Sequence, residues 1–93
     1  MQVVWDADKA FANCQKHRIS FLDGATVLDD SVALTVEDRR FDEVRFIKVG
    51  CDATGRILTI VYTYSEPADC FRLISARRAT GYERRQYEYG IEN

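Results

Sequence analysis

The sequence contains one proline, one histidine and three cysteines among 93 residues, and these low counts narrow the class of protein. A chain with 46% hydrophobic residues and a single proline is not disordered, so we expect one globular domain over residues 1–93. The cysteines, Cys14, Cys51 and Cys70, are odd in number and form no C-x-x-C pair. They therefore predict neither a disulfide framework nor a zinc site.

Long apolar segments are missing too. No apolar run reaches the roughly 18 residues of a membrane-spanning helix, and the N-terminus lacks the basic and apolar stretches of a signal peptide. We therefore expect a cytoplasmic protein without membrane association. The sequence also shows no internal repeat, linker or low-complexity segment.

Two short helices are predicted near the N-terminus. The first covers residues 6–17 and begins at Asp6, a favourable N-cap. One of its faces is apolar at helical spacing and carries Ala7, Ala10, Phe11 and Cys14. The second helix begins at Ser20, and the pair Asp29-Asp30 ends it.

From Ser31 onward the hydrophobic pattern has a period of two, which predicts β-strands. Four strands are predicted, at about residues 31–36, 44–50, 56–64 and 70–77. The third is apolar on both faces and rich in β-branched and aromatic residues, so it should be central. The short connections between strands, one of them the turn Asp52–Gly55, predict antiparallel pairing.

A third helix follows the strands. Thr80 and Glu83 have the spacing of a capping box, which starts a helix reaching about Tyr89. The complete order is two N-terminal helices, a four-stranded antiparallel sheet and a C-terminal helix. This order predicts an α+β domain in which helices cover the sheet.

Positive charge gathers near the C-terminus, although the net charge is −2. Five arginines and one acid lie between Arg72 and Arg85, and guanidinium groups bind phosphate with two parallel hydrogen bonds. We predict Arg72 and Arg77 as phosphate ligands. Residues five apart on a regular strand point to opposite faces, so the strand should end before Arg77 if both line one pocket. The alternative is a solvated face whose arginines pair with nearby carboxylates.

Several segments resemble one known family. They are Trp5-Asp6, Lys9-Ala10, Asn13, Lys16-His17, Ile19-Ser20-Phe21, Ala25, Leu28-Asp29-Asp30, Val61-Tyr62-Thr63, Arg72 to Thr80, Glu83-Arg84 and Tyr87. In order and spacing they resemble the BrnT ribonuclease toxins of bacterial type II toxin–antitoxin systems. The resemblance spans about Val3 to Tyr87.

The resemblance implies a RelE-like fold and an endoribonuclease that cleaves RNA without a metal or other cofactor, inhibiting translation and growth. It also implies a partner, a BrnA-like antitoxin whose ribbon-helix-helix part binds operator DNA, in a heterotetramer of two toxins and two antitoxins. The toxin would meet operator DNA only through this antitoxin. We expect the antitoxin to dock on the open sheet edge or on the exposed face of the first helices.

RNA cleavage without a metal requires a base, an acid and cations that stabilise the charge on phosphorus. His17 is the only histidine, and its ordinary pKa of about 6.5 suits proton exchange. Glu83 is a second candidate, although its capping-box role explains it equally well. The predicted catalytic residues are His17, Arg72, Arg77 and Glu83. The predicted RNA-binding residues are Lys16, Arg78, Arg84, Tyr62 and Tyr87, with the tyrosines stacking on bases or donating hydrogen bonds.

Two other hypotheses stay open. The first is a non-catalytic toxin-fold module that only pairs with an antitoxin, which the acidic balance favours. The arginine block, His17 and Lys16 favour the ribonuclease instead. The second is an unrelated α+β scaffold protein, for which neither toxicity nor a partner is expected.

Overall fold

A computed structural model describes residues 1–92, with side chains described for residues 1–90. The elements are β1 (Gln2–Val4), α1 (Ala7–His17), α2 (Phe21–Ala25), the 3-10 helix η1 (Thr26–Asp29), β2 (Leu34–Asp38), β3 (Arg45–Cys51), β4 (Ile57–Ser65), β5 (Cys70–Arg78) and α3 (Gly81–Glu92). Within the described residues, no helix combines the length and apolar character needed to cross a membrane.

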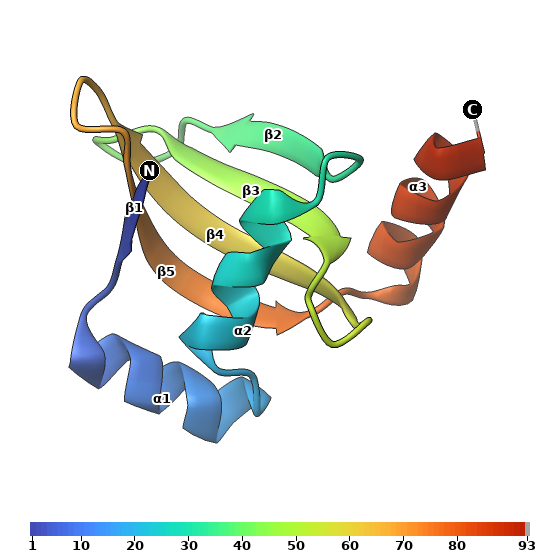
Figure 1. The fold of residues 1–93 in the computed structure, drawn as a ribbon, viewed down its shortest axis with the longest axis horizontal. Coiled ribbons are helices and arrows are strands. Elements are labelled where there is room, and N and C mark those ends of the chain that lie inside the picture. Colours follow the sequence, from blue (N-terminus) through green and yellow to red (C-terminus); the bar gives the residue numbers. More distant parts are fainter. Residues whose placement is uncertain (93) are drawn as a thin grey trace.

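The sheet has five strands in the order β1-β5-β4-β3-β2 (Figure 1). The four predicted strands are confirmed, as are their antiparallel pairing and the central position of β4. The prediction of a four-stranded, purely antiparallel sheet is wrong, because β1 pairs in parallel with β5 and makes the sheet mixed. A strand of three residues is too short to show a periodic pattern, so β1 was not predicted.

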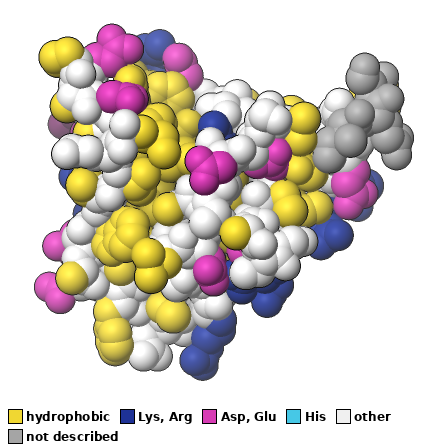
Figure 2. Space-filling view, in the orientation of Figure 1, with side chains coloured by type: hydrophobic (Ala, Val, Ile, Leu, Met, Phe, Trp, Pro, Cys, Tyr) yellow, Lys and Arg dark blue, Asp and Glu magenta, His cyan; other side chains and the backbone are white. Residues whose placement is uncertain are grey.

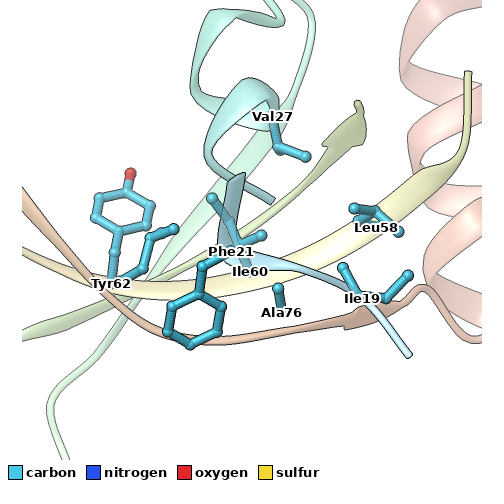
Figure 3. Packing of buried hydrophobic residues seen from close by; sticks show 8 residues of the cluster. Ile19, Phe21, Val27, Leu58, Ile60, Tyr62 and Ala76 are labelled. Atoms are coloured by element: carbon cyan, nitrogen blue, oxygen red, sulfur yellow. The ribbon is translucent and has the colours of Figure 1, made fainter. Parts of the chain in front are cut away.

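The helices α1, α2 and η1 lie against one face of the sheet, which we call the helical face (Figure 1). The core lies between them. Its buried side chains are Ile19, Phe21, Val27, Leu58, Ile60, Tyr62, Leu73 and Ala76. Figure 3 shows Phe21 beside Ile60 and Ala76 of the sheet, with Val27 above them on the helical side. The predicted second helix is confirmed at its Ser20 cap, but its α-helical part ends at Ala25 and the chain continues as η1.

The orientation of α1 differs from the expected packing of its apolar face. Phe11 is 67% exposed and Cys14 is also exposed, whereas Asn13, on the opposite side, is buried. The reason is the short length of β1, which ends at Val4 opposite Arg72 and leaves the edge of β5 unpaired beyond that point. The Asn13 amide occupies this edge, since it donates to the Ala76 carbonyl and accepts from the Ala76 N–H. Ala10 of the predicted apolar face still packs against the core, while Phe11 and Cys14 of that face are exposed.

Candidate functional site

A β-bulge in β5 brings the two predicted phosphate ligands to one face of the sheet. Arg72 lies opposite Thr63 of β4, and Arg77 lies opposite Thr59. The register shifts after Val61, so Ile74 is an extra residue that reverses the alternation of β5. The prediction that Arg72 and Arg77 point to opposite faces along an unbroken strand is therefore wrong.

The strand also does not end before Arg77, because β5 runs to Arg78. Both arginines project from the face opposite α1, α2 and η1, which we call the second face and on which α3 begins. Thr59 and Thr63 are four residues apart on β4, which corresponds to about 13 Å between the two arginine positions. In this structure the two guanidinium groups bind different carboxylates, Arg72 that of Glu43 and Arg77 that of Glu83.

Arg77 is held by Glu83 at the corner between β5 and α3. Its Nη1 and Nη2 donate to the two carboxylate oxygens of Glu83 at 2.8 and 3.0 Å. The same carboxylate accepts hydrogen bonds from the Thr59 hydroxyl at 2.9 Å and from the Thr80 backbone N–H at 2.8 Å. The Glu83 backbone N–H donates in turn to the Thr80 hydroxyl, which confirms the capping box.

These contacts fix the charge of Glu83. The Arg77 guanidinium, with help from Thr80 and Thr59, lowers the pKa of the Glu83 carboxyl from 4.5 to about 2. Glu83 is thus ionised near neutral pH and has no proton to donate. Its four hydrogen bonds make it a residue that positions Arg77 and caps α3.

Arg72 lies at the other end of β5 and is also paired. Its Nη2 donates to Glu43 at 2.7 Å, and its Nε donates to the Thr63 hydroxyl at 3.3 Å. Both side chains of this ion pair are about half exposed, so the pair is weak and open to competition by another anion. Arg72 lines a broad surface hollow far along β5 from the Arg77 corner.

His17 and Lys16 lie at the end of α1. Asn13 contacts Ala76 near the end of β5, and His17 follows Asn13 by one helical turn on the same side of α1. Since α1 and β5 run in the same direction (Figure 1), the end of α1 that carries the half-buried His17 is the end on the side of the C-terminus of β5. Lys16 beside it is exposed.

Four of the predicted site residues, Lys16, His17, Arg78 and Arg84, lie at the C-terminal end of α1, at the end of β5 and in α3, near the corner between β5 and α3. We call this region the basic corner; its members are Lys16, His17, Arg18, Arg78, Arg84 and Arg85. Figure 2 shows Lys and Arg side chains along this lower edge of the molecule. Within the described part of the chain, Lys16, Arg18, Arg78 and Arg85 form no ion pair, so their charges remain available to an anion.

The sequence prediction missed Arg18 and Arg85 as members of this corner. Arg18 adopts a left-handed conformation, φ 61°, directly after α1. Its position directly after Lys16 and His17 in the sequence could have indicated that Arg18 belongs to the same cationic group. Arg85 was counted in the arginine cluster but not selected, because only the start of α3 right after β5 reveals its position.

The two predicted tyrosines lie elsewhere. Tyr62 is 4% exposed in the core and stacks on Phe46 with 5.4 Å between ring centroids. Tyr87 is 5% exposed and donates to Asp30 at 2.6 Å. Burial and the Asp30 carboxylate together raise the pKa of Tyr87 to about 12. The structure thus gives both tyrosines packing roles away from the basic corner.

The family model of the ribonuclease toxin BrnT, of type II toxin–antitoxin systems, matches residues 5–83. This chain belongs to the BrnT family. The resemblance predicted from the sequence is confirmed, and an antitoxin partner follows from the type II system to which BrnT toxins belong. No curated protein sequence matches the chain.

The crystal structure of the Brucella abortus ribonuclease toxin BrnT, at 1.1 Å resolution, has the same fold. The TM-score is 0.67 and the sequence identity is 22%, over 86% of this chain and 97% of that chain. At 22% sequence identity, the similarity between the two structures shows a shared fold. The match to the family model thus shows that the chain is a BrnT protein, and the similarity to the crystal structure shows its fold.

Among the described residues, no group of three or more His, Cys, Asp or Glu side chains is placed to hold a metal ion. Cations dominate the basic corner, and Glu83, the carboxylate beside it, is already bonded to Arg77, Thr59 and Thr80. The corner suits a polyanion and does not suit a divalent cation, because like charges repel.

Proposed function

We propose that this protein is an endoribonuclease toxin that cleaves RNA without a metal ion and binds RNA phosphates at the basic corner. The observation that carries the proposal is the set of cations at the end of α1, at the end of β5 and in α3 that form no ion pair within the described residues, in a chain of the BrnT family. Local positive charge attracts RNA even though the chain carries −2 overall, because the field near a surface depends on nearby groups.

His17 serves in this proposal as the proton-transfer group. It removes the proton from a ribose 2′-OH or delivers one to the departing 5′-oxygen, and such catalysis contributes roughly 10²–10⁴-fold. Lys16 and Arg78 neutralise the negative charge that accumulates on the phosphoryl oxygens. Arg84 and Arg85 hold neighbouring phosphates of the same strand.

Arg77 acts beside them under the control of Glu83. Two of its nitrogens are bonded to the carboxylate, which fixes the guanidinium plane at the corner and leaves Nε and further N–H groups for a phosphate oxygen. Glu83 therefore positions Arg77 and takes no part in proton transfer. Arg72, about 13 Å away on the second face, contacts a more distant part of the RNA.

The proposal extends to the cellular setting. We expect the RNA cleavage to stop translation and growth in the cytoplasm. We expect the antitoxin to be of the BrnA kind, with a ribbon-helix-helix part that binds operator DNA, in a complex of two toxins and two antitoxins. Operator DNA is then reached only through the antitoxin.

A non-catalytic binding module is the second candidate. The observation that favours it is the pairing of the two predicted phosphate ligands, Arg72 with Glu43 and Arg77 with Glu83. A chain that has lost its RNA contacts retains only its antitoxin pairing.

Incubation of purified protein with a mixed RNA substrate in EDTA tests the ribonuclease directly. We expect cleavage by the wild type, a loss of about 100-fold or more in His17→Ala, and about tenfold in Arg78→Ala. The matched control is Arg39→Ala, an exposed arginine paired with Glu37 in the β2–β3 connection, which should cleave normally. A folded wild type that leaves RNA intact, and whose induction leaves growth unchanged, refutes the ribonuclease and supports the binding module.

A further inference from the structure

The apolar face of α1 is only partly covered by the described residues of the domain, since Ala10 packs against the core but Phe11 does not. Phe11 is 67% exposed, and Leu22 at the start of α2 is 71% exposed. Between them lies a hollow of about 250 Å³ whose lining includes Trp5 and Phe21, and among the described residues no charged side chain lines it. Two large apolar side chains exposed around an uncharged hollow are characteristic of a docking surface.

A second hollow lies on the same face of the sheet, where α1 and α2 do not cover it. It measures about 270 Å³ and is lined by Thr35, Phe46, Tyr62, Tyr64 and Phe71. Among the described residues, no charged side chain lines this second hollow. Val3 lies opposite Phe71 on β1, so the chain from Val3 to Trp5 connects the two hollows.

We call the combined surface the apolar band. It consists of Phe11, Leu22, Trp5, Phe46, Tyr64 and Phe71. Figure 2 shows hydrophobic side chains running down the left half of this view, over β1, the helices and the uncovered part of the sheet. The basic corner lies outside it, at the lower right edge. The molecule therefore has two distinct surfaces, one apolar and one cationic.

We propose that the apolar band is the docking surface for an amphipathic helix of the antitoxin. The band is formed by side chains, and the strands beneath it have their backbone groups paired within the sheet. A helix, which satisfies its own backbone groups, fits such a surface, whereas an extended segment would leave its backbone unpaired there. This inference rests on the antitoxin partner in the proposed function.

Charge at the ends of the band defines the partner further. Asp8 stands in the first turn of α1, three residues before Phe11, and Glu66 at the other end of the band acts on the Tyr64 phenol. Neither acid forms an ion pair within the described residues, whereas Asp69, which accepts from the Tyr64 hydroxyl, is paired with the N-terminal ammonium group of Met1 at 3.2 Å. Lys48 also borders the second hollow, 5.9 Å from the Tyr62 ring. The acids predominate, so the partner helix should carry Lys or Arg beside its apolar face. Such a helix is repelled by the basic corner.

A second copy of this chain fits the band less well. A symmetric dimer would bring the same band of both copies together, so the acids at its ends would meet only the charges that the band itself carries. The two edge strands of the sheet, β1 and β2, offer other surfaces that a partner could use, and Val36 of β2 is 60% exposed. The experiments below therefore include a control for a second copy of the chain and a control for docking at the edge of β2.

The test measures the affinity of the purified antitoxin encoded with this toxin for three variants. Phe11→Asp and Leu22→Asp should each weaken binding about 30-fold, because truncating an interface anchor typically removes a large part of the affinity. The matched control, Val36→Asp, makes the same change at a similarly exposed apolar residue of β2 and should bind normally. Unchanged binding by both band variants overturns the proposal, and so does a loss confined to Val36→Asp.

Cys14 offers an independent readout, because this exposed thiol lies in the lining of the first hollow. Alkylation followed by peptide mass analysis should show Cys14 protected in the complex, while Cys51, beside the turn at Asp52, reacts as before. A Cys14 that reacts equally fast with and without antitoxin refutes the docking surface.

Sedimentation of the toxin alone settles the second-copy alternative. A dimer that Phe11→Asp dissociates without changing antitoxin affinity assigns the band to self-association and overturns the proposal. RNA cleavage by the free variants separates this inference from the proposed ribonuclease. Band variants that cleave RNA but lose the antitoxin support both proposals, whereas a wild type that binds through the band without cleaving RNA supports only the docking surface.

Discussion

Replacing Glu83 with glutamine separates the charge of this residue from its shape. The Glu83→Gln side chain can still complete the capping box, since its amide oxygen accepts from the Thr59 hydroxyl and the Thr80 N–H. The lost feature is the ion pair with Arg77. A fall in the Glu83 pKa from 4.5 to about 2 corresponds to about 3 kcal/mol of folding free energy at pH 7.

The stabilisation by the Arg77–Glu83 ion pair should decrease as the pH falls. Because the folded-state pKa is lowered, the stabilisation is complete above the unfolded pKa of 4.5 and disappears as the pH falls toward 2. At pH 3 about 1 kcal/mol of it should remain. Other carboxylates titrate in both proteins and cancel when wild type and Glu83→Gln are compared.

Urea unfolding at pH 7 and pH 3 measures the two differences. We expect Glu83→Gln to be less stable than the wild type by up to about 3 kcal/mol at pH 7, and by about 1 kcal/mol at pH 3. A gap that stays constant between these pH values refutes the claim that the Arg77 ion pair controls the Glu83 charge. A small gap at both values shows that solvent screens the pair.

Two further predictions concern the attachments of the helices. Asn13→Ala leaves the buried N–H and C=O of Ala76 without partners, so it should lower the free energy of unfolding in urea by about 3 kcal/mol. The control, Gln15→Ala at an exposed position of the same helix, should change it by no more than about 0.5 kcal/mol. Equal losses in the two variants would contradict the edge-pairing role of Asn13. Tyr87→Phe removes the 2.6 Å hydrogen bond to Asp30, so the free energy of unfolding should fall by about 1–3 kcal/mol and the amides of α3 should exchange hydrogen faster. Unchanged hydrogen exchange would show that this bond does not hold α3 in place.

Local sequence signals determined the helix starts, the four long strands and the turn between β3 and β4. Asp6, Ser20 and Thr80 each accept the expected hydrogen bond from a backbone N–H of the first turn. Gly55 has φ +92°, and the buried Asp52 carboxylate accepts from the backbone of the same turn. These features depend on residues within a few positions of each other, which is why the sequence reveals them.

Pairing between distant segments was not accessible from the sequence. The parallel strand β1 rests on three residues that pair with β5 about 68 positions later. The bulge at Ile74 exists because β4 and β5 fall out of step, and a single strand's alternation contains no sign of it. That bulge decided which face carries Arg77.

The same limit applies to the site. Composition and order identified a cationic segment, a lone histidine and the BrnT family from the sequence itself. Only the tertiary structure decided that Arg72 and Arg77 are paired with carboxylates, that Arg78 is left without one among the described residues, and that Tyr62 and Tyr87 are buried. It also decided that Asn13 faces the sheet while Phe11 faces outward. Helical periodicity gives the two sides of a helix, but the free hydrogen-bonding groups of a distant strand edge select which side is buried.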